Sequence, residues 1–228
     1  MLMEIYMADI RALANEQVLL EKCELLSRER KEQIQKLRKP EDKRRSVGVG
    51  LLLEYGLQQS GYTLCEDVSD KTLAHVAKGR YGKPRLAEVE DLHFNLSHSG
   101  DYVAAVFAEC EAGIDIECVQ TANLAVARRF FKENEYEHLE TILLEDGEGD
   151  RLNLAFSELW TRKESYIKAV GEGMHLPLTD FCVLSDVVEE NEVYNLKTWA
   201  LPEGCVLSVC ARGAIDARIT WVDLLKII

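Results

Sequence analysis

The strongest periodic pattern of apolar and polar positions runs from Phe156 to Gly173. Apolar residues recur there at the spacing of an α-helix, which predicts an amphipathic helix packed on a core. This apolar stripe consists of Phe156, Leu159, Trp160, Ile167 and Val170. Lys163 falls in the middle of the stripe, whereas Glu164 and Lys168 lie one turn apart along its edge. Lys163 therefore has two interpretations, a buried stem whose ammonium reaches the surface or a contact with a ligand.

The rest of the chain combines helical spacing with short alternating segments. Helices are predicted at residues 15–39, 46–60 and 121–144, and Pro40 separates the first two. Strands are predicted at residues 1–8, 92–97, 102–108, 113–117, 181–188, 193–201, 205–211 and 217–225. Each half thus contains helices and antiparallel strands. We expect an α+β fold with two similar lobes, residues 1–110 and 111–228, and a functional cleft between them.

Composition narrows the class of protein. The chain has 228 residues, of which 47% are hydrophobic, and a formal net charge of −13. This acidic balance argues against binding to nucleic acid or to an anionic membrane, because both are held mainly by Lys and Arg. The seven cysteines are scattered without a C-x-x-C motif, so neither a disulfide framework nor a zinc site is indicated. With no secretory signal and no long apolar run, we expect a cytoplasmic protein.

One segment departs from the acidic average. Between Arg28 and Arg45 there are nine basic residues and four acidic ones. Such a run is commonly a solvated helix face, but here it is also the clearest docking place for a phosphate. The sequence leaves both interpretations open.

The segment Gly113-Ile114-Asp115-Ile116-Glu117 places two carboxylates on one face of a predicted strand. If Asp115 and Glu117 meet Glu164, they form an all-oxygen site that suits a hard cation such as Mg²⁺. Lys163, Lys168 and the basic segment would then neutralise a polyanionic substrate. This combination predicts phosphoryl-transfer chemistry on a substrate that contains a diphosphate.

These motifs resemble a known family. G-I-D-I-E at 113–117, followed by W-T-R-K-E-S-Y-I-K at 160–168, is similar to the 4′-phosphopantetheinyl transferases of the Sfp type. Y-G-K-P at 81–84 and F-N-L-S-H-S at 94–99 match the earlier motifs of that family, in the same order. The resemblance implies a pseudo-twofold fold whose lobes enclose coenzyme A. It also implies transfer of 4′-phosphopantetheine to a serine of an acyl or peptidyl carrier protein, with release of 3′,5′-ADP.

The resemblance further implies roles for individual residues. The metal ligands would be Asp115, Glu117 and Glu164, binding Mg²⁺ or alternatively Mn²⁺. Catalytic roles would fall to Glu164 as a base, acting directly or through a water, and to Lys168 and His98 on the departing phosphates. The expected coenzyme contacts are Arg30, Arg45, Ser46, Tyr81, Gly82, Lys83, Pro84, Ser97, His98, Asp115, Lys163 and Lys168.

One departure affects the expected 3′-phosphate contacts. The family has two lysines in the first helix, and Arg30 and Gln33 align with them here. Arg30 can replace a lysine, but Gln33 carries no charge. The alternatives are Lys31 and Lys36, or Arg44 and Arg45 together with the Ser46 backbone.

Two other functions fit parts of the pattern. A Mg²⁺-dependent nuclease also uses clustered carboxylates, but Val119 stands where its lysine is expected, and the acidic charge disfavours DNA. A non-catalytic coenzyme-binding or carrier-binding module would be expected to lose a carboxylate or the lysine, and none is missing.

The carrier protein would be a transient partner, bound by the exposed part of residues 121–144. Candidate apolar anchors are Phe130, Phe131 and Tyr136, and candidate charges are Arg128, Arg129 and Lys132. Because one chain holds both lobes, we expect a monomer. The sequence names neither the carrier nor its pathway, whether fatty-acid, polyketide or nonribosomal peptide synthesis.

Overall fold

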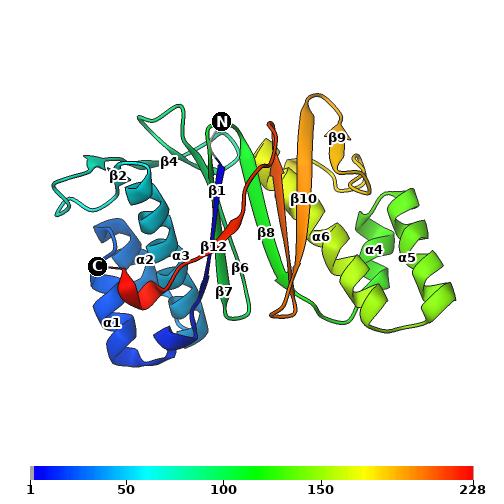
Figure 1. The fold of residues 1–228 in the computed structure, drawn as a ribbon, viewed down its shortest axis with the longest axis horizontal. Coiled ribbons are helices and arrows are strands. Elements are labelled where there is room, and N and C mark those ends of the chain that lie inside the picture. The colour runs from blue at the N-terminus through cyan, green and yellow to red at the C-terminus, as the bar shows by residue number, and fades with distance from the viewer. Residues whose placement is uncertain (1–2, 228) are drawn as a thin grey trace. The chain divides into compact units, whose positions relative to one another are not determined.

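The structure is a computed structural model that describes residues 3–227. Contacts between Cα atoms divide the chain into two compact units (Figure 1). The N-terminal unit contains residues 3–78, 84–109 and 217–227, and the C-terminal unit contains residues 79–83 and 110–216. The units differ from the predicted lobes in two segments, since 79–83 joins the C-terminal unit and the chain's last residues join the N-terminal one.

A four-stranded sheet in the order β12-β1-β7-β6 forms the centre of the N-terminal unit. Its strands are β1 (Met3–Asp9), β6 (His93–Ser99), β7 (Tyr102–Ala108) and β12 (Ile219–Trp221). β1 pairs antiparallel with β7, Met3 facing Ala108, and parallel with β12, Ile5 facing Ile219. β6 and β7, predicted as strands at 92–97 and 102–108, form an antiparallel hairpin, and β6 extends beyond its predicted end to include His98 and Ser99.

The helices of the N-terminal unit are α1 (Glu16–Glu24), α2 (Arg28–Lys36) and α3 (Pro40–Gln59). The prediction of one helix over 15–39 was wrong, because the chain leaves helical geometry between Glu24 and Arg28. Asn15 caps α1 by accepting hydrogen bonds from the backbone of Gln17 and Val18. Pro40 is the first residue of α3. Proline fits there because it lacks a backbone N–H, and the N–H groups of the first turn of a helix form no hydrogen bond within the helix.

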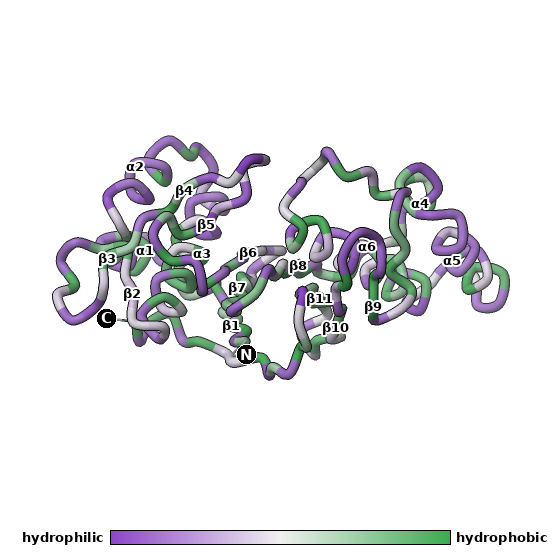
Figure 2. Tube along the Cα trace, turned by 90° about the horizontal axis from the view of Figure 1, so that it is seen from above, coloured by the Kyte–Doolittle hydropathy of each residue, from purple (hydrophilic) through white to green (hydrophobic). Residues whose placement is uncertain are grey.

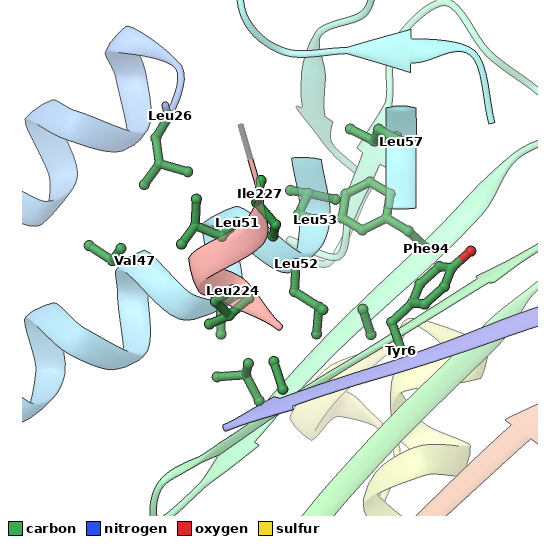
Figure 3. Close-up of a cluster of buried hydrophobic side chains, with 14 of the residues drawn as sticks. Tyr6, Leu26, Val47, Leu51, Leu52, Leu53, Leu57, Phe94, Leu224 and Ile227 are labelled. Carbon is green, nitrogen blue, oxygen red and sulfur yellow. The ribbon is translucent and has the colours of Figure 1, made fainter. Parts of the chain in front are cut away.

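Apolar residues of α3 fill the space over the sheet. Val47, Leu51, Leu52 and Leu57 are fully buried. In Figure 3 they lie with Leu26 beside α3, Tyr6 and Phe94 from the sheet, and Leu224 and Ile227 from the chain's last segment. That segment includes a short 3₁₀ turn (Leu224–Lys226). The core of this unit is therefore closed by residues from both ends of the sequence.

Two small pairs of strands complete the N-terminal unit. β2 (Tyr62–Thr63) pairs with β3 (Thr72–Leu73), and β4 (Val76–Lys78) pairs with β5 (Pro84–Leu86). The buried carboxylate of Glu54 accepts hydrogen bonds from the Thr63 hydroxyl and the Leu64 backbone, which attaches β2 to α3. By contrast α2 is hydrophilic along almost its whole length (Figure 2) and buries only Ile34.

The C-terminal unit contains a second four-stranded sheet, ordered β8-β11-β10-β9 and antiparallel throughout. Its strands are β8 (Ala112–Cys118), β9 (Val187–Glu189), β10 (Val193–Leu201) and β11 (Cys205–Ala211). Its helices are α4 (Leu124–Phe130), α5 (Glu133–Asp146) and α6 (Asp150–Val170). α6 packs on β8 and β11, and α5 packs on α6 (Figure 1).

Helix α6 approaches β8 very closely at Gly113. A Cβ atom at this position would lie 2.1 Å from the Ser165 carbonyl oxygen and 2.4 Å from the Ala169 nitrogen. Only glycine fits there, because the neighbouring atoms belong to the helix backbone and cannot turn aside. The glycine of the 113–117 motif thus sets the distance between the strand and the helix that carry the candidate site.

Three more features bear on the expectations from sequence. The helix predicted from Phe156 begins earlier, at Asp150, and ends at Val170, followed by Gly171, whose φ of 80° is favourable for glycine. Within residues 3–227, no helix is long and apolar enough to cross a membrane. None of the seven cysteines, all of which lie in the described part of the chain, forms a disulfide.

Candidate functional site

The centre of the candidate site is an ion pair between β8 and α6. Asp115 is 4% exposed although it carries a carboxylate. The Lys168 Nζ atom lies 2.6 Å from Asp115 Oδ1 and donates a second hydrogen bond, of 3.2 Å, to the Ile114 carbonyl. Ile114 and Ile116, on either side of Asp115, are fully buried, and in a β-strand their side chains point to the face opposite to Asp115. The core position of the isoleucines fixes the carboxylate toward α6.

Glu164 belongs to the same group of charges, one helical turn before Lys168. Burial raises the pKa of Glu164, and the negative charges of Asp115 and Glu117 raise it further, while Lys168 opposes the shift. These electrostatic effects require that the carboxylates lie near one another. Glu164 thus interacts electrostatically with Asp115, Glu117 and Lys168, the residues with which the sequence motifs group it.

The chemistry of this group suits a hard divalent cation. Its donors are carboxylate oxygens, and their mutual repulsion would be relieved by a positive ion. However, no three His, Cys, Asp or Glu side chains among the described residues are grouped closely enough to hold a metal by themselves. Mg²⁺ does not need three protein ligands, because it is commonly bound by one or two carboxylates together with substrate phosphates and several waters.

Lys163 requires a correction. Its side chain is fully buried, and its ammonium donates hydrogen bonds to the Leu178 carbonyl (2.7 Å) and the Phe181 carbonyl (2.9 Å). The third partner is the equally buried carboxylate of Glu135, 2.7 Å away. A lysine held in the core by three oxygen atoms has no donor left for a coenzyme, so the expected contact is wrong and Lys163 is a structural residue.

Glu135 is a structural residue that the sequence reasoning missed. It is the third residue of α5, and its carboxylate also accepts hydrogen bonds from the backbone N–H of Lys132 (2.8 Å) and of Val183 (2.7 Å). One buried acid thus connects the start of α5, the helix α6 and the chain after it. The position of Lys163 within an apolar stripe was the available signal for a buried acidic partner, because a buried charge needs a group of opposite charge.

The turn at 79–83 is attached to the C-terminal unit by Lys83. Its ammonium donates hydrogen bonds to the Ala169 carbonyl near the end of α6 (2.9 Å) and to the Ala112 carbonyl at the start of β8 (3.1 Å). Burial lowers the pKa of Lys83 to about 8, against the opposing effect of Glu111. These contacts make Lys83 an anchor that positions the turn.

The anchored turn presents an aromatic ring. Tyr81 is 41% exposed, and its ring centroid lies 4.9 Å from that of His175 in the 3₁₀ turn Gly173–His175. Arg80 lies over the same ring at 5.2 Å. Gly82 has a φ of 88°, which allows the tight turn before Lys83 and Pro84. A planar, partly exposed ring beside a cation is a suitable surface for a flat heterocycle.

A cavity in the N-terminal unit has a volume of about 950 Å³. Its lining includes Arg30, Gln33, Lys78 and Phe94. Burial lowers the pKa of Arg30, and the described residues supply no ion-pair partner for its guanidinium. Lys31, in contrast, is paired with Glu24 at 2.9 Å. A half-buried guanidinium without a counter-charge is a favourable position for an anion.

The other predicted phosphate contacts also belong to the N-terminal unit. Ser97 is buried and His98 exposed at the end of β6. Arg45 of α3 donates a hydrogen bond to the Gly100 carbonyl in the following turn, which brings α3 and this turn together. Ser46, the next residue of α3, is partly exposed. Arg30, Arg45, Ser46, Ser97 and His98 thus all belong to the N-terminal unit, whereas the carboxylates and Lys168 belong to the C-terminal unit.

Carboxylates beside a lysine suit an enzyme that transfers phosphate-linked groups, because a bound cation and the ammonium can both neutralise phosphate oxygens. Comparisons with known proteins agree with this class. Residues 111–209 match the model of the 4′-phosphopantetheinyl transferase superfamily. The 4′-phosphopantetheinyl transferase Sfp of Bacillus subtilis (strain 168) is 32% identical over 194 residues, 82% of each chain.

Two further relatives bear related names. The 4′-phosphopantetheinyl transferase ffp of Bacillus subtilis is 31% identical, covering 87% of this chain and 88% of its own. The 4′-phosphopantetheinyl transferase gsp of Aneurinibacillus migulanus is 42% identical over 106 residues, 46% of this chain and 42% of its own. The present chain thus belongs to the 4′-phosphopantetheinyl transferase superfamily.

Proposed function

We propose that this enzyme transfers the 4′-phosphopantetheine group of coenzyme A to a serine hydroxyl of an apo acyl or peptidyl carrier protein and releases 3′,5′-ADP. The observation that carries the proposal is the group formed by Asp115, Glu117, Glu164 and Lys168 in the C-terminal unit. This arrangement supplies both a set of oxygen donors and a cation for a diphosphate. Family membership supports the same reaction.

The carboxylates would hold Mg²⁺, or alternatively Mn²⁺. The bound ion would neutralise the diphosphate of the coenzyme and withdraw charge from the reacting phosphorus. Asp115 and Glu117 would belong to this set of ligands from β8, and Glu164 from α6. Lys168, which now pairs with Asp115, would also donate to a phosphate oxygen and stabilise the charge that develops on the departing 3′,5′-ADP.

Glu164 is our candidate for the general base. A neutral serine hydroxyl is a poor nucleophile, so a carboxylate must accept its proton directly or through a water. Burial and the neighbouring carboxylates of Asp115 and Glu117 raise the pKa of Glu164 in the metal-free enzyme.

The remaining residues would bind the coenzyme. Arg30 would face the 3′-phosphate, with Arg45 and the Ser46 backbone as further donors, and Ser97 and His98 would contact the diphosphate. Tyr81 and the adjoining Gly82 and Pro84 would lie along the adenine. Lys83 would not contact the adenine itself but would position the turn that does, because its ammonium donates to the Ala112 and Ala169 carbonyls.

The carrier would contact the surface of α4 and α5. Arg128 and Arg129 are exposed, and Phe130 is partly exposed with Arg129 over its ring at 5.0 Å. Phe131 is 3% exposed and belongs to the core, so it does not serve as an anchor. We further propose that the enzyme acts in the cytoplasm as a monomer, without binding nucleic acid or membrane.

A direct test is incubation with coenzyme A, Mg²⁺ and several apo-carriers, followed by intact-mass measurement. We expect at least one carrier to gain a single phosphopantetheine group, and this gain to disappear on chelation of the metal. The proposed function fails if no carrier is modified with either Mg²⁺ or Mn²⁺ while a verified family member modifies the same carriers.

A further inference from the structure

Two cysteines face each other across the sheet of the C-terminal unit. Cys118 is the last residue of β8 and Cys205 the first residue of β11, and they are direct partners in the antiparallel register. Their sulfur atoms are 2.6 Å apart, and both residues are present as thiols. No substrate or metal contact proposed for the transfer reaction uses either thiol.

The hydrogen-bond pattern gives this pair the geometry of a cross-strand disulfide. The Val119 N–H donates to the Gly204 carbonyl at 2.9 Å, so residues 119 and 204 form a hydrogen-bonded pair. Pairs alternate along an antiparallel ladder, which makes Cys118 and Cys205 a non-hydrogen-bonded pair with Cα atoms about 4.5 Å apart. Disulfides span Cα distances of about 4.4–6.8 Å, so a bond needs little backbone movement.

Access differs between the two sulfurs. Cys205 is 1% exposed, whereas Cys118 is partly exposed at the end of its strand. An oxidant from solution therefore reaches Cys118 first, and Cys205 is placed to react with the product. The neighbour of Cys118 in the sequence is Glu117, one of the carboxylates of the candidate site.

We propose that Cys118 and Cys205 form a reversible disulfide when the protein meets a small-molecule disulfide such as oxidised glutathione. The Cys118 sulfur, having lost its proton, attacks one sulfur of the oxidant and forms a mixed disulfide, and the first small thiol leaves. The Cys205 sulfur then loses its proton and attacks the Cys118 sulfur, releasing the second small thiol. Two protein thiols are oxidised and one small disulfide is reduced to two thiols.

The bond joins residues that are 87 positions apart in the sequence. A cross-link over so long a loop restricts the unfolded chain strongly, and a pair already in contact adds little strain to the folded state. We therefore expect the oxidised protein to keep its fold and to melt about 5 °C or more above the reduced protein.

The test combines intact mass, peptide mapping and thermal melting of the full chain. After treatment with oxidised glutathione and blocking of the remaining thiols, we expect the loss of two hydrogen atoms and a peptide pair linked through Cys118 and Cys205. Dithiothreitol should restore both thiols. Cys205→Ser should stop at a glutathione adduct on Cys118, and Cys118→Ser should form neither species. Cys182→Ser, which removes a thiol engaged by Asn134, should form the disulfide as the parent does.

Three results would overturn the inference. These are a stable glutathione adduct on Cys118 in the unaltered chain, a disulfide that joins other cysteines, and an oxidised protein that melts below the reduced one. None of these measurements depends on transferase activity, so the inference and the proposed function can fail independently.

Discussion

The ammonium of Lys168 lies 2.6 Å from the carboxylate of Asp115, so two predicted active-site residues contact each other directly. Asp115 is almost completely buried, and Lys168 is its cationic partner. A bound metal and a diphosphate would compete for these same groups, since the metal needs the carboxylate and the phosphate needs the ammonium. The ion pair therefore holds both groups in position before the ligands arrive.

Asp115→Asn should reduce transfer to a carrier at least about 100-fold, because it removes an anionic metal ligand and the counter-charge of Lys168. Rates should be compared over a range of Mg²⁺ concentrations by intact mass. Glu148→Gln removes an exposed carboxylate from a loop of the same unit and should leave the rate unchanged. An Asp115→Asn enzyme with the parent rate and the parent Mg²⁺ dependence would show that this carboxylate does not bind the metal.

Lys163→Met should lower the free energy of unfolding by about 3–5 kcal/mol, because it leaves the buried Glu135 carboxylate without its cation. The double variant Lys163→Met, Glu135→Gln should recover part of that loss in a urea titration. KM for coenzyme A should remain at the parent value in the folded fraction. A rise in KM for coenzyme A without a loss of stability would show that Lys163 does contact the coenzyme.

Gly113→Ala should destabilise the protein by about 1–3 kcal/mol, since the added methyl group would collide with the backbone of α6. Gly149→Ala is a matched control, because its φ of 171° is extended and no atom lies within 4 Å of the added carbon. Chemical denaturation of both variants would measure the difference. Equal stability of the two would mean that α6 can move away from β8 without loss.

Lys83 should titrate with a midpoint of about 8, well below an ordinary lysine, because burial disfavours its charged form. Between pH 8 and the ordinary lysine pKa, the unfolded chain binds more protons at this position than the folded chain does. Lys83 therefore makes the free energy of unfolding rise with pH over that interval, and Lys83→Met should remove this part of the slope. The ε-carbon resonance lost in the variant identifies the titration by NMR, and a midpoint near 10.5 would contradict the burial of the ammonium.

Arg30→Gln should raise KM for coenzyme A about tenfold, because a charge-assisted contact with the 3′-phosphate is lost. KM for 3′-dephospho-coenzyme A, which lacks that phosphate, should be unaffected. Arg38→Gln removes an exposed charge from the same basic segment and serves as the control. Equal effects of Arg30→Gln on the two substrates would assign Arg30 to another part of the coenzyme.

For three strands, the bounds predicted from the sequence agree with the structure at every residue. β7, β10 and β11 match their expected bounds, because each is a continuous apolar or alternating segment ended by turn residues. Residues 181–186 were wrongly predicted as strand. There Arg162 donates to the carbonyls of Val183 and Ser185, so side-chain hydrogen bonds replace a ladder. An interaction between residues so far apart in the chain leaves no local pattern.

In the candidate site, too, local patterns were predictable and interactions between distant residues were not. Asp115 and Glu117 could be placed on one face of a strand, and Glu164 and Lys168 on one edge of a helix, because periodicity fixes the direction of each side chain. That the two pairs act together was an expectation that came from the family resemblance. The partner of Lys163 could not be inferred from the sequence, since Glu135 lies on another helix. The anchoring role of Lys83 was also hidden, because its two acceptors are backbone carbonyls, which every sequence position possesses.

Strand β12, with the 3₁₀ turn that follows it, completes the sheet and core of the N-terminal unit. During synthesis on a ribosome, the residues of β12 are made after every residue of the C-terminal unit. The unit that is begun first would thus be finished last, contrary to the usual order in which domains fold as they emerge. Until β12 is made, the edge of β1 with which it pairs would stay open to strands of other chains. A chaperone, or slow translation of the last residues, would therefore affect the yield of folded enzyme.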